Sequence, residues 1–167
     1  LENSKYPAWT NVESFYATLL DAVRRQPGIE AAGLANATVL QPGWRIAVDG
    51  RPLPRPEEAP IAQHVTVSAG YFEAFRARLL GGRFFQDSDT AASEPVIVVN
   101  ESLANRLGIS SPGGTLSLLT HDGWVPFRIA GIYADYTSTR GTVRMDLDVY
   151  RRLWGDDRLN GMALFLP

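Results

Sequence analysis

The chain has 167 residues, 16 basic and 18 acidic side chains, a net charge of -2, and no cysteine. This length suits one ordinary domain or two small ones, and the balanced charge excludes the basic footprint of a nucleic-acid-binding protein. The absence of cysteine excludes a disulfide framework, a thiolate metal site and a cysteine nucleophile. No apolar run approaches the roughly 20 residues that a membrane-spanning helix needs.

The first expected element is an amphipathic helix over residues 11–26. Thr10 begins a capping-box pattern at its start, and a Pro-Gly pair stops it. Strands are expected next over residues 29–40 and 44–48, and the second one ends at a turn-forming Asp-Gly pair. Four prolines within residues 51–60 then predict an exposed, extended loop.

Residues 61–85 are expected to form a strand, a sharp turn into a helix, and an exit marked by glycines. Ser68 ends the alternating strand pattern, and its hydroxyl is expected to cap the helix by accepting a backbone N–H. Phe72, Phe75 and Leu79 have helical spacing, which predicts one apolar helical stripe. A Gly-Gly pair then ends the helix.

The second half of the chain alternates strands, short helices and a hairpin. Residues 95–99 form a β-branched apolar run, which is typical of a strand buried on both faces. Asn100 is expected to cap the helix that follows, and a hairpin is expected over residues 115–134. This mixture of helices, strands and hairpins indicates an α+β architecture. The remaining expected elements are a loop at 137–141, a strand at 142–146, a helix at 147–154 and a strand at 160–166.

Candidate catalytic and metal-binding residues are few, and each has a structural interpretation. His64 and His121 are far apart in the sequence, so ordinary surface positions are the stronger interpretation. Asp87 and Asp89 lack the glycine and the distal glutamate of a calcium-binding loop, which favours a solvated turn. Asp146 is better explained as a helix cap than as half of a carboxylate pair. These residues alone predict a domain that is not an enzyme.

Two residues are candidates for contact with a partner. Trp44 lies beside the proline-rich loop, where an exposed indole would mark a contact surface and a buried one would anchor the core. Arg83 follows the double glycine and could reach a partner or cover the sheet with its aliphatic stem. The sequence leaves both alternatives open.

Three segments together resemble a known family. They are residues 67–72 (VSAGYF), 80–89 (LGGRFFQDSD) and 95–104 (PVIVVNESLA). The series closely resembles the extracytoplasmic periplasmic core domain of MacB-like and FtsX-like ABC transporter permeases. Residues 135–157 are similar to a subgroup of large FtsX-like permeases that carry two such domains per chain. The resemblance covers about residues 10–166.

The resemblance implies a fold of two parts. Residues 1–80 and 159–167 would form a mixed-sheet, porter-like α/β subdomain, and residues 81–158 would form a smaller, inserted β-rich subdomain. The family's porter part continues past a strand like that at 160–166, so this subdomain is expected to be truncated or shorter here. Positive φ angles are expected at the double glycine. The residues matched to the family motif are expected to be structural: Ser68, Gly70, Phe72, Gly81, Gly82 and Asn100.

The resemblance also implies a mechanical function. A separate cytoplasmic ATPase subunit binds and hydrolyses ATP, and the domain passes the resulting movement to an extracytoplasmic protein, lipoprotein or cargo without a cofactor of its own. The parent protein is expected in the cytoplasmic (inner) membrane with a second permease copy, and no nucleic acid is expected as a partner. A sensory or small-ligand-binding module is the alternative. A hydrolase has the least support, because the sequence offers no nucleophile–base pair.

Overall fold

The computed structural model of the chain describes residues 9–36, 43–86, 88–90, 92–135, 141–156 and 161–166, with side chains from residue 14 onward. Its helices are α1 (Trp9–Arg24), α2 (Tyr71–Ala74), α3 (Glu101–Leu107) and α4 (Leu147–Trp154), with a 3₁₀ turn η1 at Pro56–Glu58. Its strands are β1 (Ala31–Asn36), β2 (Trp44–Val48), β3 (Ile61–Val67), β4 (Arg78–Gly82), β5 (Val96–Asn100), β6 (Thr115–Thr120), β7 (Gly123–Ala134), β8 (Thr142–Asp146) and β9 (Gly161–Phe165).

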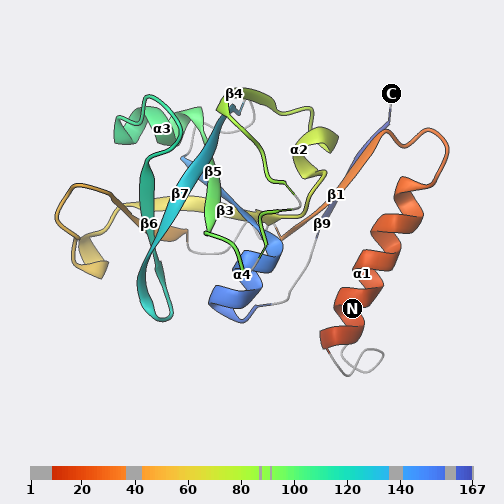
Figure 1. The fold of residues 1–167 in the computed structure, drawn as a ribbon, viewed down its shortest axis with the longest axis horizontal. Helices are drawn as coiled ribbons and strands as arrows, with labels where there is room; N and C mark the ends of the chain where they lie inside the picture. Colours follow the sequence, from red (N-terminus) through yellow and green to blue (C-terminus); the bar gives the residue numbers. More distant parts are fainter. Residues whose placement is uncertain are drawn as a thin grey trace.

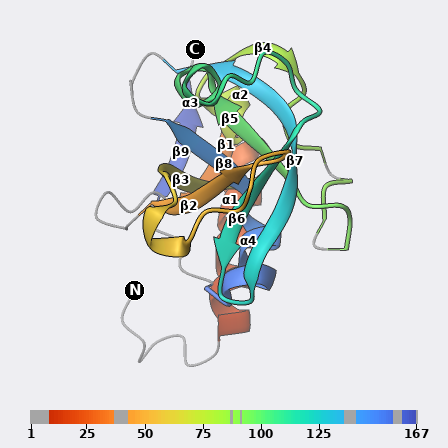
Figure 2. The same ribbon diagram turned by 90° about the vertical axis from the view of Figure 1, so that its left-hand side faces the viewer.

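Six of the strands close into a barrel. β2 pairs with β6, β6 with β7, β7 with β5, β5 with β8, β8 with β3, and β3 pairs back onto β2. The β5–β7 and β3–β8 pairs are parallel and the other four pairs are antiparallel, which confirms the predicted mixed sheet. Figure 2 looks onto the barrel, and Figure 1 shows it beside β1, β9 and α1.

The barrel interior holds the largest apolar core. Ile46, Ile97, Phe127 and Met145 are each fully buried there, because alternate residues of every strand face inward. Each such side chain contributes about 1.5–3 kcal/mol through its removal from water. Leucines of α3 and Val149 of α4 join the same core, and the two helices lie toward opposite ends of the β6–β7 pair in Figure 1.

A smaller layer extends the sheet beyond the barrel. β1 pairs with β3, and β9 pairs with β1. α1 packs on this extension, with Leu20 against Ala32 and Leu34 of β1 (Figure 1). The predicted first helix and the predicted last strand are therefore confirmed. The helix begins at Trp9, so Thr10 lies within it and is not its cap.

The predicted helical stripe after β3 is wrong. α2 ends at Ala74, Arg76 adopts a positive φ of 47°, and the chain continues as β4, which pairs with β7. Phe75 is 56% exposed and Leu79 is 36% exposed, so neither belongs to a buried helical face. Pairing of Leu79 with Tyr133 of β7 outweighs the local helical pattern, as tertiary contacts often do.

The strand pairing also bears on the predicted subdomain boundary near residue 80. β2 and β3 precede this boundary, yet they pair with β6 and β8 in the same barrel. The core likewise contains Ile46 and Ile97 from its two sides. The division into residues 1–80 with 159–167 and residues 81–158 stays a prediction, and the barrel draws strands from both parts. Residues 37–40, 137–140 and 160 of the predicted elements lie outside the described residues.

Candidate functional site

Ser68 joins two strands and does not cap a helix. Its Oγ accepts a hydrogen bond from the backbone N–H of Leu34 at 2.9 Å, and its own N–H donates to the Leu34 carbonyl at 3.0 Å. The N-cap of α2 is Gly70, which has no side-chain cap. The predicted cap is wrong because the chain makes a turn between Ser68 and α2, and the hydroxyl faces β1.

Arg24 holds the end of α1 against the same place, and the sequence analysis missed it. Its Nη2 donates to the carbonyl of Ala69 at 2.7 Å and to that of Ala32 at 3.0 Å. A basic residue in the last turn of a helix suits the helix dipole. That local signal indicates the residue type, but it does not reveal partners on β1 and beside β3. We call the contacts of Arg24, Leu34 and Ser68 the junction.

Two positions, Gly70 beside the junction and Gly82 at the end of β4, require glycine. Gly70 has φ of 86° and Gly82 has φ of 73°, so the predicted positive φ is confirmed at Gly82. A Cβ at Gly70 would lie 2.6 Å from the carbonyl oxygen of Ala32, and a Cβ at Gly82 would overlap the carbonyl oxygen of Ala130. Gly81 is not among the glycines with positive φ, so that part of the prediction is wrong: the turn needs one such residue and Gly82 supplies it.

Phe72 anchors the short helix α2 to the outside of the barrel. Its ring is 3% exposed, stacks on Phe84 with ring centres 4.2 Å apart, and meets Tyr133 edge-on at 5.6 Å. Such aromatic pairs add about 0.5–1.5 kcal/mol beyond the burial of area. The ring therefore connects α2, the segment after β4, and β7.

Asn100 caps α3 as predicted and makes a second connection. Its Oδ1 accepts from the backbone N–H of Leu103 at 3.0 Å and from that of Thr142 at 2.9 Å. Asn100 is fully buried, so both bonds form away from water. The capping contact is local and follows from the sequence, whereas the contact with β8 depends on the tertiary fold.

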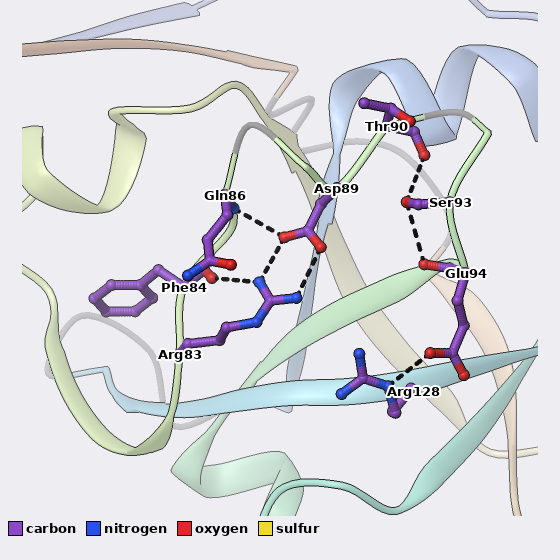
Figure 3. Close-up of polar contacts among 8 residues, drawn as sticks. All are labelled: Arg83, Phe84, Gln86, Asp89, Thr90, Ser93, Glu94 and Arg128. Carbon is purple, nitrogen blue, oxygen red and sulfur yellow. Dashed lines mark hydrogen bonds and ion pairs between the residues drawn. The ribbon is translucent and has the colours of Figure 1, made fainter.

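Arg83 and Asp89 form an internal ion pair (Figure 3). Arg83 Nη1 donates to Asp89 Oδ2 at 2.6 Å, and Nη2 donates to Oδ1 at 2.8 Å. The same carboxylate accepts from the backbone N–H of Gln86 at 2.8 Å. The Arg83 hydrogen bond is the largest effect that lowers the pKa of Asp89. This pairing corrects the prediction of a solvated turn at Asp89, while Asp87 lies outside the described residues. Contact of Arg83 with a partner stays a prediction.

Of the two alternatives for Trp44, the structure shows the buried anchor. It is 6% exposed and stacks between His64, at 4.1 Å, and Trp154, at 4.7 Å between ring centres. An exposed contact surface at Trp44 is therefore ruled out. His64 is half-buried rather than a surface residue, and burial lowers its pKa to about 4, an effect that Asp156 opposes. His121 lies in an exposed hairpin turn, as predicted.

A cavity of about 350 Å³ adjoins the junction between α1, the turn after β3, the loop at 86–90 and the start of α4. Arg24, Ser68 and Asp146 line it, so it carries charges of both signs. Asp146 caps α4, as predicted, by accepting from the N–H of Asp148 at 2.9 Å. Burial raises the pKa of Asp146 to about 6. The described residues contain no group of three or more His, Cys, Asp or Glu side chains placed to hold a metal ion.

The junction connects α1 with β1 and the turn after β3, and the Arg83–Asp89 pair holds the segment that follows β4. These contacts supply hydrogen bonds and aromatic packing, which position segments relative to one another. None of the described helices is long and apolar enough to cross a membrane.

Solved structures with a similar fold belong to transporters. The periplasmic region of MacB from Actinobacillus actinomycetemcomitans superposes with a TM-score of 0.64 at 16% identity, over 90% of this chain and 64% of that one. The extracellular domain of the noncanonic ABC-type transporter YknZ from Gram-positive bacteria gives a TM-score of 0.62 at 11% identity, over 88% of this chain and 70% of that one. At these identities the likeness shows the fold.

Sequence comparison agrees with the fold. An uncharacterized ABC transporter permease protein of Mycobacterium tuberculosis is 33% identical over 70 residues, which are 42% of this chain and 8% of that protein. The matched region is therefore a small part of a much longer relative. The profile of the MacB-like periplasmic core domain matches residues 4–165. The chain thus belongs to the family of MacB-like periplasmic core domains of ABC transporter permeases.

Proposed function

We propose that this domain transmits movement from the membrane part of an ABC transporter permease to an extracytoplasmic partner or cargo. The observation that carries the proposal is that β3 belongs to both layers of the fold. Through residues 66–67 it pairs with β1, and through residues 63–67 it pairs in parallel with β8 of the barrel. A displacement of α1 and β1 would therefore reach the barrel through hydrogen-bonded strands.

The junction supports this role because its hydrogen bonds hold α1 and β1 to the end of β3. The backbone of Ser68 continues the pairing to Leu34, and Arg24 ties α1 to the turn that follows β3. Both ends of the described chain lie on the α1–β9 side, away from the barrel (Figure 1). In the proposal, movement enters on this side and leaves through the barrel.

The partners belong to the same proposal. A cognate ATPase subunit binds ATP and acts on the transmembrane part of the permease, and a second permease copy completes the transporter. The parent protein lies in the cytoplasmic membrane with this domain on the extracytoplasmic side. The partner of the barrel is an extracytoplasmic protein or lipoprotein, and the domain itself performs no bond chemistry.

A small-ligand-binding module is the second candidate function. The observation that favours it is the cavity of about 350 Å³ beside the junction, whose volume falls within the range of small-molecule sites. The mechanical proposal has the stronger support, because the family comparisons concern transporter permeases.

The test uses the complete permease with its ATPase in lipid nanodiscs. A fluorophore on Asp122→Cys, in the exposed turn between β6 and β7, reports energy transfer to an acceptor lipid at the membrane surface. We expect the transfer efficiency to differ between the nucleotide-free and the vanadate-trapped transporter. A label on Asp21→Cys of α1 is the matched control, because it reports the energy transfer from α1 and so shows whether the whole domain moves.

The two candidate functions give different results in this experiment. A mechanical domain moves with the nucleotide state of the ATPase. A ligand-binding module that does not transmit movement would keep the same transfer efficiency in both nucleotide states, and that result would contradict the proposal.

A further inference from the structure

Arg144 carries a positive charge into the apolar cluster on the outside of the barrel. Its neighbours Val143 and Met145 are fully buried in the barrel core, so the Arg144 side chain points to the opposite face of β8. On that face its guanidinium carbon lies 5.8 Å from the ring centre of Tyr71 and 5.9 Å from that of Tyr133. Because arginine is not deprotonated in proteins, this position is permanently cationic.

Two donors of Arg144 have no acceptor. Its Nε and Nη1 atoms are shielded from solvent, and neither donates a hydrogen bond within the part of the chain that the structure describes. A shielded donor without an acceptor is costly, and more so when it is charged. The structure therefore presents unused hydrogen-bond donors on a fixed positive charge.

A cavity of about 100 Å³ lies beside the Arg144 guanidinium. The rings of Tyr71, Phe72 and Phe75 form its apolar wall, and Tyr133 lines it from β7. Burial raises the pKa of Tyr71 and of Tyr133, so both phenols keep their protons, and Tyr133 donates its proton to Asp135. We call this cavity the Arg144 pocket.

The charges around the pocket favour an anion. Arg76 and Arg78 also line it, and Asp135 is the carboxylate that faces them. Asp135 accepts a hydrogen bond from the Tyr133 hydroxyl at 3.4 Å, and Arg76 lies 3.5 Å from Glu30 across an exposed contact. The described lining therefore holds the guanidinium groups of Arg76, Arg78 and Arg144 against the carboxylate of Asp135, so its charge is positive.

We propose that the Arg144 pocket binds a small carboxylic acid with an aromatic ring, its carboxylate on Arg144 and its ring against Tyr71 and Phe75. A carboxylate is planar and offers the acceptors that a guanidinium fits best. An aromatic ring suits the aromatic wall, since ring pairs prefer offset or edge-on packing. The volume of about 100 Å³ lies far below the ~300–1,000 Å³ of sites for drug-sized ligands, which favours a small ligand. This ligand site does not depend on the mechanical role.

Nuclear magnetic resonance of the 167-residue chain with ¹⁵N-labelled arginine tests the proposal. Benzoate is the probe, and benzamide is its neutral counterpart of the same shape. We expect benzoate to shift the Nε–Hε signal of Arg144 saturably and to bind at least about tenfold more tightly than benzamide, because charge-assisted hydrogen bonds are about twice as strong as neutral ones. A dipeptide that ends in phenylalanine is compared with benzoate. Tighter binding of the dipeptide would indicate a peptide C-terminus as the ligand, and tighter binding of benzoate would indicate a free acid.

Two substitutions and one control complete the test. Arg144→Met is expected to abolish benzoate binding, and Arg144→Lys, which keeps the charge but loses the planar fork, to weaken it about tenfold. Arg25→Met, at an exposed position just after α1, is expected to leave benzoate binding unchanged. Equal affinities for benzoate and benzamide, or shifts confined to Arg76 and Arg78, would overturn the proposal. The wild-type titration gives these results even if Arg144→Met does not fold.

Discussion

Ser68 and Leu34 exchange two hydrogen bonds, one through the Ser68 hydroxyl at 2.9 Å and one through its backbone N–H at 3.0 Å. These bonds extend the pairing of β3 and β1 beyond the last residue of β3. They place a side chain in the connection between the α1 layer and the barrel. The connection can therefore be weakened without any change in the core.

Ser68→Ala removes the acceptor for the Leu34 N–H and leaves that donor unpaired. We expect a loss of about 1–2 kcal/mol in the free energy of unfolding, measured by urea denaturation. Ser110→Ala, at an exposed position, is the control and is expected to change little. Equal midpoints for the two variants would show that the hydroxyl bond does not stabilise the fold.

Gly82→Ala tests the close approach of Gly82 to the Ala130 carbonyl. Gly50 has a similar φ of 75°, but a Cβ there would meet no heavy atom within 4 Å, so Gly50→Ala measures the backbone strain alone. Strain of this kind costs about 1–3 kcal/mol. We expect Gly82→Ala to lower the thermal midpoint clearly more than Gly50→Ala does. If Gly50→Ala were equally damaging, the overlap with β7 would have no role.

Asp89→Asn tests the ion pair with Arg83. The Arg83 hydrogen bond lowers the pKa of Asp89 in the folded state. The ion pair therefore stabilises the fold at pH values above 3.8, the ordinary pKa, and this stabilisation is lost as the pH falls through the lower pKa of the folded state. We expect a loss of about 1–2 kcal/mol at pH 7, an amount reduced because Arg83 is 32% exposed. The denaturation curves of the variant and the wild type should differ at pH 7 and converge at low pH, where Asp89 is protonated. Asp122→Asn, in an exposed turn, is the control.

His64→Phe tests the burial of His64 as a neutral ring beside Trp44. The unfolded chain protonates His64 near the ordinary pKa of 6.5, whereas burial lowers the folded pKa to about 4. The unfolded state therefore binds more protons between these values, and the contribution of His64 to stability falls as the pH drops from 6.5 towards 4. Between pH 7.5 and pH 5, we expect the free energy of unfolding to fall by about 1–2 kcal/mol less for the variant than for the wild type. His121→Gln should follow the wild type, and an unchanged slope for His64→Phe would refute the buried, neutral state.

Local signals in the sequence predict the elements whose contacts are local. The β-branched run of β5, the Asn100 cap of α3 and the turn at residues 121–122 each depend on neighbouring residues. The structure confirms all three. The family resemblance likewise rests on short motifs, at residues 67–72, 80–89 and 95–104, and the family profile confirms it.

Pairings between segments that are distant in the sequence could not be predicted. β4 is a strand because Leu79 pairs with Tyr133, and the barrel closes because Trp44 pairs with Ala62. A helical or alternating pattern of apolar residues shows neither pairing, because it reflects only neighbouring residues. The junction escaped prediction for the same reason, since Ser68 finds its partner in an earlier strand, at a sequence separation of 34.

The central claim is that β3 carries movement from α1 to the barrel, and a distance measurement within the domain tests it most directly. The domain has no cysteine, so spin labels on Asp21→Cys and Asp122→Cys can be placed in a permease stripped of its other cysteines and diluted with unlabelled protein. Electron–electron double resonance then gives the distance between α1 and the barrel in the nucleotide-free and vanadate-trapped states. The account predicts the same distance in both states, while energy transfer from the barrel to the membrane changes. A nucleotide-dependent change in the distance between α1 and the barrel would contradict it.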